Sequence, residues 1–295
     1  MSEGVAVNVS LDELRQWIGR TESRIERLAP TPVAALAATL DRDDPEPRDG
    51  DTLPALWHWL YFLPLAAQSQ IGEDGHPRRG GFLPAVPLPR RMWAGGSLTF
   101  HQPLHIGETV TRVSRIENVD LKQGRSGTLV FVNVQHELSG ANGLAITERQ
   151  DIVYREVATR VEAARPRLAP QSCDWSREIV PSEPLLFRYS ALTFNSHRIH
   201  YDRPYATSVE GYPALVVHGP LIATLLVDLV RRSVRDTAIE TFAFRAVAPL
   251  FSSTSFDVCG ARGAESGAVE LWAKNGQGEL AMEAKATLNS YRSES

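Results

Sequence analysis

Hydrophobic and polar residues alternate along two runs of the chain. Four segments of the first run have a period near two and many β-branched residues, as half-buried strands do: residues 96–104, 109–119, 128–138 and 144–156. Four segments of the second run have the same pattern: residues 240–250, 253–262, 267–276 and 279–289. The pattern therefore predicts two groups of antiparallel strands.

Helical spacing of hydrophobic residues occurs ahead of each group of strands. Ser10-Leu-Asp-Glu13 is a capping box and predicts a helix that continues to Trp17. Residues 32–40 predict a second helix, with Pro32 in its first turn. Residues 218–233 are hydrophobic around much of the helix surface and close with two arginines, which predicts a buried helix.

Because helix precedes strands in both halves, the chain is predicted to be an α+β protein with two similar domains. We assign residues 1–157 to the first domain and residues 185–295 to the second, which opens with a predicted strand at 187–195. Residues 158–184 contain proline, alanine and arginine without periodicity and are interpreted as a linker. Residues 72–81, rich in glycine and charge, are interpreted as a solvated loop.

Composition narrows the class of protein. The chain has 295 residues, of which 43% are hydrophobic and 22% charged, with a net charge of -4. A nucleic-acid binder would be basic, so no nucleic-acid partner is expected. Cys173 and Cys259 lack the spacing of a disulfide framework or a zinc site. Neither a signal peptide nor a membrane span is recognisable, and we expect a cytoplasmic protein with no membrane partner.

Residues 191–206 gather hydrogen-bonding and titrating side chains behind a hydrophobic lead-in. His200 can take and give a proton near neutral pH. Asn195 cannot titrate, but its amide can hold a water or a substrate oxygen. Asp202 can orient an imidazole or accept backbone N–H groups in a turn. Downstream, Gly219 opens the predicted buried helix, where a backbone N–H can stabilise negative charge that develops on a substrate carbonyl.

Structural interpretations of the same residues stay open. A polar turn with two histidines is more often structural than catalytic when nothing else is known. His197 and His200 have a spacing that permits metal binding, but no further ligand pattern accompanies them, so we expect no metal and no other cofactor. His218 is of a kind more often buried and hydrogen-bonded than catalytic.

The residue sequence of this segment resembles the motif of a known family. The string Asn195-Ser-His-Arg-Ile-His200-Tyr-Asp, followed by Ala206 and then by Gly-Tyr-Pro-Ala-Leu-Val-Val-His-Gly-Pro-Leu, resembles the hydratase motif of MaoC-like hot-dog proteins. That motif reads Asp-x-Asn-Pro-Ile-His, with a His-Gly pair at the start of the hot-dog helix. The resemblance implies a double hot-dog, in which two antiparallel sheets each wrap a central helix. It places Asn195, His200 and Gly219 at the catalytic positions.

The motif departs from the family's usual pattern in one important way. Asn195 replaces the family's catalytic carboxylate, so His200 would have to do most of the base work. This variant, together with Leu88 to Glu108, is similar to the branch that includes hydroxyacyl-thioester dehydratase type 2 and mesaconyl-C4-CoA hydratase. The resemblance gives a substrate-binding role to a further set of residues: Arg90, Arg91, Trp93, Arg198, Tyr201, Asp202 and His218.

The resemblance implies a hydro-lyase that acts on a coenzyme A thioester and forms a homodimer. It implies reversible hydration of an α,β-unsaturated acyl thioester, with a short branched dicarboxylic enoyl-CoA (mesaconyl-C4-CoA or itaconyl-CoA, giving citramalyl-CoA) as the expected substrate. Only the second domain matches the catalytic motif, and the first would widen the substrate groove. A 3-hydroxyacyl-thioester dehydratase of the fatty-acid type and a non-catalytic acyl-CoA-binding protein are the alternatives. Arg90 and Arg91 could equally be surface residues or contact coenzyme A phosphates.

Overall fold

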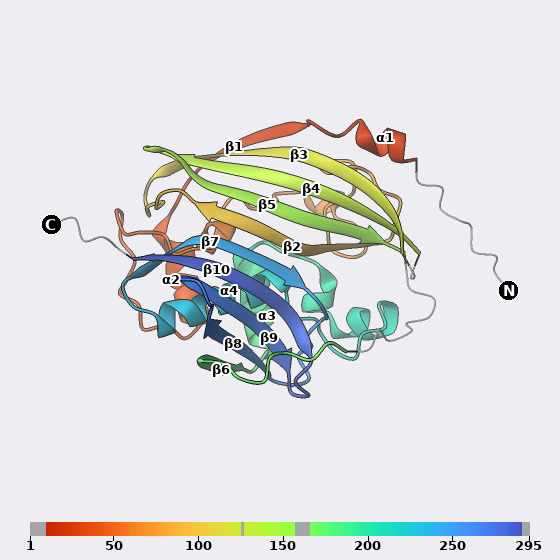
Figure 1. The fold of residues 1–295 in the computed structure, drawn as a ribbon. Helices are drawn as coiled ribbons and strands as arrows, with labels where there is room; N and C mark the ends of the chain where they lie inside the picture. Colours follow the sequence, from red (N-terminus) through yellow and green to blue (C-terminus); the bar gives the residue numbers. More distant parts are fainter. Residues whose placement is uncertain (1–9, 125–126, 157–165, 291–295) are drawn as a thin grey trace.

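The computed structural model describes residues 10–124, 127–156 and 166–290. Its main feature is one antiparallel sheet in the order β1-β3-β4-β5-β2-β7-β10-β9-β8-β6 (Figure 1). The strands of the N-terminal half are β1 (Thr21–Arg27), β2 (Arg90–Phe100), β3 (Thr109–Gly124), β4 (Gly127–Gly140) and β5 (Gly143–Arg155). Those of the C-terminal half are β6 (Trp175–Ile179), β7 (Thr237–Ala246), β8 (Phe256–Arg262), β9 (Ala268–Asn275) and β10 (Leu280–Ser290).

The two halves join edge to edge through β2 and β7. Gly95 pairs with Arg245, and the pairing continues to Thr99 opposite Thr241. A Cβ atom on Gly95 would lie 2.6 Å from the backbone oxygen of Phe244, so a larger residue would push the two strands apart there. The two sheets predicted from the sequence are therefore one continuous sheet.

The inner faces of the two halves are covered differently. Helix α4 (Gly219–Ser233) packs against β6, β8, β9 and β10, and its residues 221–230 are all buried. Helix α2 (Pro30–Thr39) instead packs chiefly against α3 (Glu183–Leu192) and the 3₁₀ turn η1 (Trp57–Leu60). The inner face of the N-terminal half is thus left to loops and to a cavity.

A buried carboxylate fastens the C-terminal end of α4 to both halves. The side chain of Asp228 is fully buried and accepts hydrogen bonds from Arg177 at 3.0 Å and from Arg232 at 2.7 Å. It also pairs with Arg42, which follows α2 and holds Asp44. Because three guanidinium groups compensate its charge, Asp228 can stay buried in this position.

Most elements predicted from the sequence are present. Ser10 caps the short helix α1 (Leu11–Arg15), α2 and α4 occupy the other two predicted helices, and the eight predicted strands correspond to β2–β5 and β7–β10. The prediction of an α+β double hot-dog is confirmed. One detail differs from the expectation that each sheet wraps a central helix. Among the described residues, a long central helix lies under the C-terminal half alone.

The prediction of a strand at residues 187–195 is wrong. These residues belong largely to α3, which Ser182 caps by accepting a hydrogen bond from the Leu185 N–H. Leu186 and Tyr189 are buried three positions apart, which is helical spacing. The capping serine and the proline at the start of the helix were the sequence signals that favoured a helix.

The predicted linker, residues 158–184, also contains an element. Strand β6 lies inside it and pairs with β8 at the edge of the sheet. Residues 157–165 lie outside the described residues. The short strand β1, with the sequence TESRIER, was not predicted because its polar composition is that of an edge strand. The assignment of residues 1–157 and 185–295 to two domains stays a prediction.

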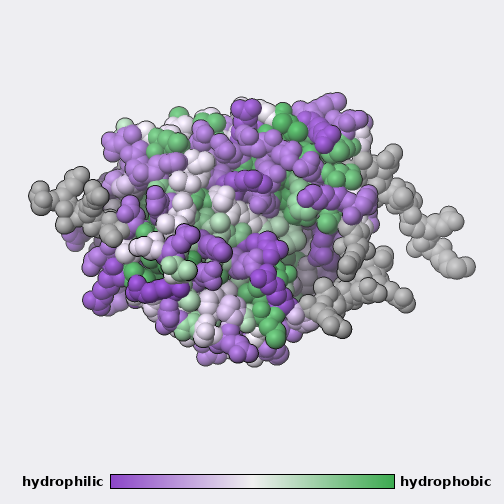
Figure 2. All heavy atoms as spheres, viewed as in Figure 1, coloured by the Kyte–Doolittle hydropathy of each residue, from purple (hydrophilic) through white to green (hydrophobic). Residues whose placement is uncertain are grey.

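The outward face of the sheet is largely hydrophilic, with hydrophobic side chains scattered over it (Figure 2). On β7, for example, Phe242 and Phe244 are buried while Ala243 and Arg245 between and beside them are exposed. Within the described part of the chain, no helix combines the length and hydrophobicity that a membrane crossing requires.

Candidate active site

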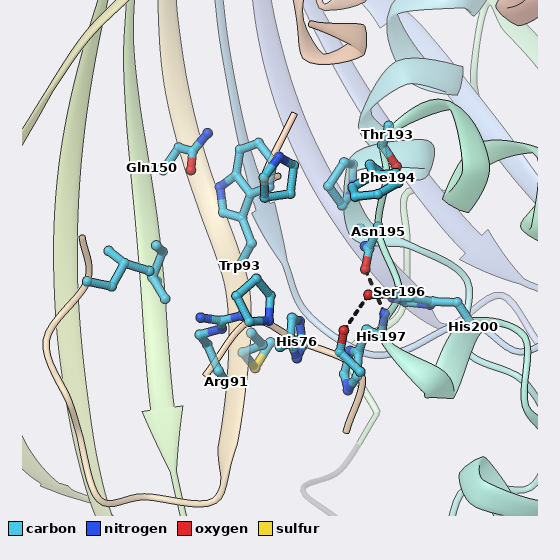
Figure 3. A pocket seen from close by; sticks show the side chains of 18 of the residues that line it. His76, Arg91, Trp93, Gln150, Thr193, Phe194, Asn195, Ser196, His197 and His200 are labelled. Carbon is cyan, nitrogen blue, oxygen red and sulfur yellow. Dashed lines mark hydrogen bonds between the residues drawn. The ribbon is translucent and has the colours of Figure 1, made fainter. Parts of the chain in front are cut away.

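A cavity of about 1190 Å³ lies between the inner face of the N-terminal half and the segment around His200 (Figure 3). Its lining includes strands β2, β4 and β5 on one side and residues 193–197, 199 and 200 with the start of α4 on the other. Of the ten residues predicted to form the site, six line this cavity: Asn195, His200, Gly219, Arg90, Arg91 and Trp93.

His200 is fixed in the tautomer that a general base needs. It ends the 3₁₀ turn η3 (Arg198–His200), and its Nδ1 lies 2.8 Å from the carbonyl oxygen of Val216. A carbonyl only accepts, so Nδ1 carries the proton and Nε2 has a free lone pair. Burial lowers the pKa of His200 to about 4, although the bond to Val216 acts in the opposite direction. The ring is therefore neutral near pH 7.

His218 supports His200 from behind. The two imidazoles stack with ring centroids 3.6 Å apart, and His218 Nε2 lies 2.8 Å from Ser190 Oγ. His218 is fully buried and is not among the residues that line the cavity. Its substrate-binding role therefore has no geometric support, whereas the structural interpretation, a buried hydrogen-bonded histidine, agrees with its position.

Asn195 presents an amide donor beside His200. Its Oδ1 accepts the backbone N–H of His197 at 3.0 Å, and no hydrogen bond from its Nδ2 is found among the described residues (Figure 3). The preceding residue, Phe194, has a φ of 50°, which is unusual for a bulky side chain and orients the turn. Asn195 can therefore donate to a water or substrate oxygen but cannot remove its proton.

Gly219 provides a backbone donor at the first position of α4. Among the described residues no acceptor is found for its N–H, as expected in the first turn of a helix. A Cβ atom at Gly219 would meet only the Trp93 backbone oxygen, at 3.9 Å, so the cavity is open there. The helix dipole adds to the attraction of this N–H for a developing oxyanion.

The three predicted residues from η3 and the turn after it do not line the cavity. The Arg198 guanidinium is held by Asp202 at 2.7 Å and lies over the Tyr205 ring. Tyr201 is 45% exposed and donates its hydroxyl to the Ser196 carbonyl. Substrate-binding roles for Arg198, Tyr201 and Asp202 stay predictions, and their contacts instead brace the turn that carries His200.

The predicted residues on β2 do reach the cavity, with different degrees of freedom. Arg90 is bound to the carboxylate and the backbone oxygen of Glu210. Trp93 donates its Nε1–H to Gly95 and packs against Trp59. No carboxylate pairs with Arg91 within the described part of the chain; its guanidinium lies beside the Tyr154 hydroxyl, where burial raises the pKa of Tyr154 and the charge of Arg91 opposes this. It is therefore the guanidinium of this group that is free to meet a negatively charged ligand.

Sequence analysis missed a second group of titrating residues in the segment interpreted as a solvated loop, residues 72–81. In this segment Asp74 Oδ2 lies 3.0 Å from His76 Nδ1, and both residues line the cavity. The ring of His76 lies 4.0 Å from that of His197, and His197 lies 5.4 Å from His200 (Figure 3). The pairing of Asp and His around a glycine was the only signal that the sequence offered.

Glycine makes the close docking of this loop possible. Gly75 has a φ of +88°, and a Cβ atom there would lie 1.8 Å from the Ser196 carbonyl oxygen. The Ser196 hydroxyl donates to the Gly75 carbonyl, and the Arg198 N–H donates to the Asp74 carbonyl. The N-terminal half thus locks onto the segment that carries Asn195 and His200.

The same residues are of the types that bind transition metals. Candidate ligand atoms of Asp74, His76 and His197 lie within 4.8 Å of one another. The metal site considered from the sequence used His197 and His200, but His200 Nδ1 is engaged with Val216. Two imidazoles and a carboxylate suit several divalent metals, and no step of the chemistry below depends on one.

A polar cluster also lines the N-terminal side of the cavity. The buried Glu148 carboxylate accepts from Trp59 Nε1 at 3.0 Å and from Gln150 Nε2 at 2.8 Å, and lies 3.0 Å from His58 Nε2. Burial raises the pKa of Glu148, but the hydrogen bond with His58 and its other partners outweigh burial and lower it to about 2. This carboxylate is therefore ionised and already satisfied.

Comparison with known proteins relates the chain to acyl-thioester dehydratases. The family model of hydroxyacyl-thioester dehydratase type 2 matches residues 56–252, which include the loop at 72–81, the His200 segment and α4. The chain is 51% identical over 241 residues to mesaconyl-C(4)-CoA hydratase of Chloroflexus aurantiacus, covering 81% of this chain and 86% of that protein. It is 28% identical to the mitochondrial hydroxyacyl-thioester dehydratase type 2 of Schizosaccharomyces pombe, covering 69% and 76%.

Solved structures support the fold. A MaoC-like dehydratase from Phytophthora capsici has a TM-score of 0.69 at 15% identity, covering 97% of this chain and all of that one. A MaoC domain dehydratase described as putative, from Chloroflexus aurantiacus, has a TM-score of 0.59 at 12% identity, covering 97% and 98%. With the match to the family model over most of its length, this chain belongs to the hydroxyacyl-thioester dehydratase type 2 family.

Proposed function

We propose that this protein is a hydro-lyase that reversibly adds water across the α,β double bond of an enoyl-CoA. The substrate is a short branched dicarboxylic thioester, mesaconyl-C4-CoA, or itaconyl-CoA with water adding to the same β-carbon across its β,γ double bond, and the product is citramalyl-CoA. The observation that carries the proposal is the neutral imidazole of His200, whose Nδ1–H is held by Val216 at the wall of a cavity that Gly219 also lines. The 51% identity to a mesaconyl-C(4)-CoA hydratase supports the choice of substrate.

The proposed chemistry follows from these donors and acceptors. Asn195 Nδ2 and His200 Nε2 hold the water, and His200 takes its proton as the oxygen bonds to the β-carbon. The thioester oxygen gains enolate charge, which the Gly219 N–H stabilises. Since Asn195 has no proton to exchange, it positions the water and His200 acts as the base.

Arg91 is the proposed partner of the substrate's free carboxylate. Its guanidinium lines the cavity and, unlike that of Arg90, has no carboxylate partner among the described residues. A guanidinium can bind a carboxylate through two parallel hydrogen bonds. Arg91→Met should therefore lower kcat/KM for mesaconyl-C4-CoA by about 10- to 100-fold, as expected for losing hydrogen bonds to a charged group.

The loss of enoyl-thioester absorbance on hydration measures this directly with crotonyl-, octenoyl-, mesaconyl-C4- and itaconyl-CoA. Crotonyl-CoA has no second carboxylate and should be affected little by Arg91→Met. Arg149→Met is the matched control, since Arg149 pairs with Asp151 and does not line the cavity. Equal losses on mesaconyl-C4-CoA and crotonyl-CoA would remove Arg91 from carboxylate binding.

A second candidate is a 3-hydroxyacyl-thioester dehydratase for longer linear chains. The size of the cavity favours this activity, because a volume of about 1190 Å³ lies above the usual range for small-ligand pockets and leaves room for a longer acyl chain. The relative from Schizosaccharomyces pombe bears that family's name. Preference for octenoyl-CoA in the panel would select this activity, and inactivity on all four thioesters would favour a protein that only binds acyl-CoA. A homodimer and a cytoplasmic location stay predictions.

A further inference from the structure

The proposed reaction needs two proton transfers, and His200 of the C-terminal half is oriented for the first. Water gives up a proton as it adds to the β-carbon, and the α-carbon must gain one. His200 can accept the first proton. Asn195 stands where the family motif has a carboxylate and cannot deliver the second, because an amide does not titrate in this range.

Asp74 and His76, from the N-terminal half, form a ready-made acid–base pair in the same cavity. Asp74 Oδ1 accepts the His76 backbone N–H at 2.9 Å, and Oδ2 lies 3.0 Å from His76 Nδ1. A carboxylate on Nδ1 fixes the proton there and leaves Nε2 to exchange protons, and it also stabilises the imidazolium once formed. His200 Nδ1, by contrast, faces a neutral carbonyl.

The position of His76 suits a reaction shared with His200. The His197 ring lies against both, 4.0 Å from the His76 ring and 5.4 Å from the His200 ring between centroids, so the three imidazoles gather in one part of the cavity (Figure 3). Arg91 is near enough that, after burial and against the Asp74 hydrogen bond, its charge also lowers the pKa of His76. Arg91 and His76 thus line the same part of the cavity in which a substrate carboxylate would be bound.

We propose that the Asp74–His76 pair is the second proton-transfer group of this active site and serves the α-carbon. The proposal rests on the proposed hydratase function. In hydration, a water O–H bond breaks, its proton goes to His200 Nε2 and its oxygen bonds to the β-carbon. The π electrons of the double bond move to form the enolate, whose α-carbon takes the Nε2 proton of His76 in its imidazolium form; burial lowers the pKa of His76, and Asp74 on Nδ1 stabilises the imidazolium against it. Cavity water then carries the proton from His200 back to His76.

The opposite direction uses the same groups. His76 removes the α-proton of the hydroxyacyl thioester, and His200 protonates the hydroxyl that leaves as water. Asp74 keeps the Nδ1 proton throughout and acts as a positioning residue. The competing interpretation is that Asp74 and His76 merely hold the loop at residues 72–81 against the His200 segment.

The test compares His76→Gln, Asp74→Asn and the matched control His101→Gln during hydration in deuterated water. His101 lies outside the cavity and contacts Thr147. Wild-type enzyme should place deuterium on one face of the α-carbon. His76→Gln should lower kcat at least 100-fold with KM changed only a few-fold, and its residual product should lose the stereospecific label.

Asp74→Asn separates a chemical role from a structural one. The amide keeps an acceptor for His76, so the loop should stay docked, but the carboxylate no longer stabilises the imidazolium and the pKa of His76 falls. The limb of the kcat/KM profile that reports protonated His76 should therefore move to lower pH. If the pH profile of Asp74→Asn is unshifted and only its melting temperature falls, the pair serves loop docking alone. This result decides the question even if His76→Gln fails to fold.

The outcomes distinguish the two proposals. A wild-type enzyme without hydration of any thioester in the panel would overturn the function and, with it, the pair's role. An active wild type together with His76→Gln that retains kcat and stereospecific labelling would overturn the pair's role alone. Activity lost on chelation and restored by Zn²⁺ would replace it by a metal site at Asp74, His76 and His197, whereas full activity after chelation supports proton transfer.

Discussion

The two halves share a sheet but use its inner face in opposite ways. In the C-terminal half α4 covers the strands, and ten consecutive residues of the helix are buried. In the N-terminal half the corresponding face lines the cavity and carries Glu148 and Gln150. One half therefore supplies the packed scaffold for His200 and Gly219, and the other supplies space, polar contacts and the loop with His76.

The difference shows why, among the described residues, only one half of the sheet has a long helix packed on its inner face. A hydrophobic helix placed on a sheet fills the space in which a substrate would bind, because protein interiors are packed as densely as organic crystals. Here α2 packs against α3 rather than against the strands of the N-terminal half. The open face then becomes the wall of the binding cavity, while the covered face keeps the site rigid.

The largest expected effect tests whether the C-terminal half carries the base that activates water. His200→Ala should lower kcat by about 100- to 10,000-fold, as loss of a general base does. The matched variant is His136→Gln on the N-terminal wall, where His136 Nδ1 meets Ser114 Oγ at 2.8 Å. Its kcat should stay within a few-fold of wild type. Steady-state hydration rates measure both, and similar losses would mean that the N-terminal wall around His136 also takes part in the chemistry.

The next effect tests the anchoring of α4 to both halves. Asp228→Ala leaves three arginines without their buried carboxylate and should lower the free energy of unfolding by about 3–5 kcal/mol. Asp257→Ala is the control, since Asp257 only approaches Lys274 at 3.7 Å near the surface, and should cost less than about 1 kcal/mol. Urea unfolding measures both, and a small loss at Asp228 would show that helix packing alone holds α4.

A somewhat smaller effect concerns acid stability of the covered half. Burial lowers the pKa of His200 to about 4, below its value of about 6.5 in an unfolded chain. Between these values the unfolded state binds more protons, so stability falls as pH is lowered from about 6.5 to about 4, by up to about 3 kcal/mol from this residue. His200→Gln should flatten the decline in urea midpoints, and His101→Gln should leave it unchanged. A decline identical in His200→Gln would refute the assignment.

The smallest effect probes the polar wall of the open half. Gln150→Leu removes one donor to Glu148, whose carboxylate keeps Trp59 and His58 as partners. We expect the transition-state stabilisation measured by kcat/KM to fall by about 1 kcal/mol or less, through an increase in KM. Rates with crotonyl- and octenoyl-CoA measure it, and a kcat loss comparable to that of His200→Ala would give the N-terminal wall a part in the chemistry.

Local sequence patterns predicted much of the fold for a physical reason. Side chains alternate across a strand and repeat about every 3.6 residues on a helix, so eight strands and α4 could be recognised from neighbours in the chain. Residues 187–195 misled this reasoning because their hydrophobic spacing suits both structures, and the decisive cap at Ser182 lies outside the segment.

In the candidate site, too, some residues could be predicted from the sequence and others could not. Asn195, His200 and Gly219 lie within one short stretch, and their residue types alone indicated a base, an amide and a backbone donor. The sequence thus determined the strands, the buried helix and one side of the site. Only the tertiary structure brought Gly75 against Ser196, 121 residues away, and with it His76. It also paired Arg198 with Asp202 and left Arg91 without a carboxylate partner among the described residues. Such contacts depend on how distant segments pack, and no pattern of neighbouring residues records that.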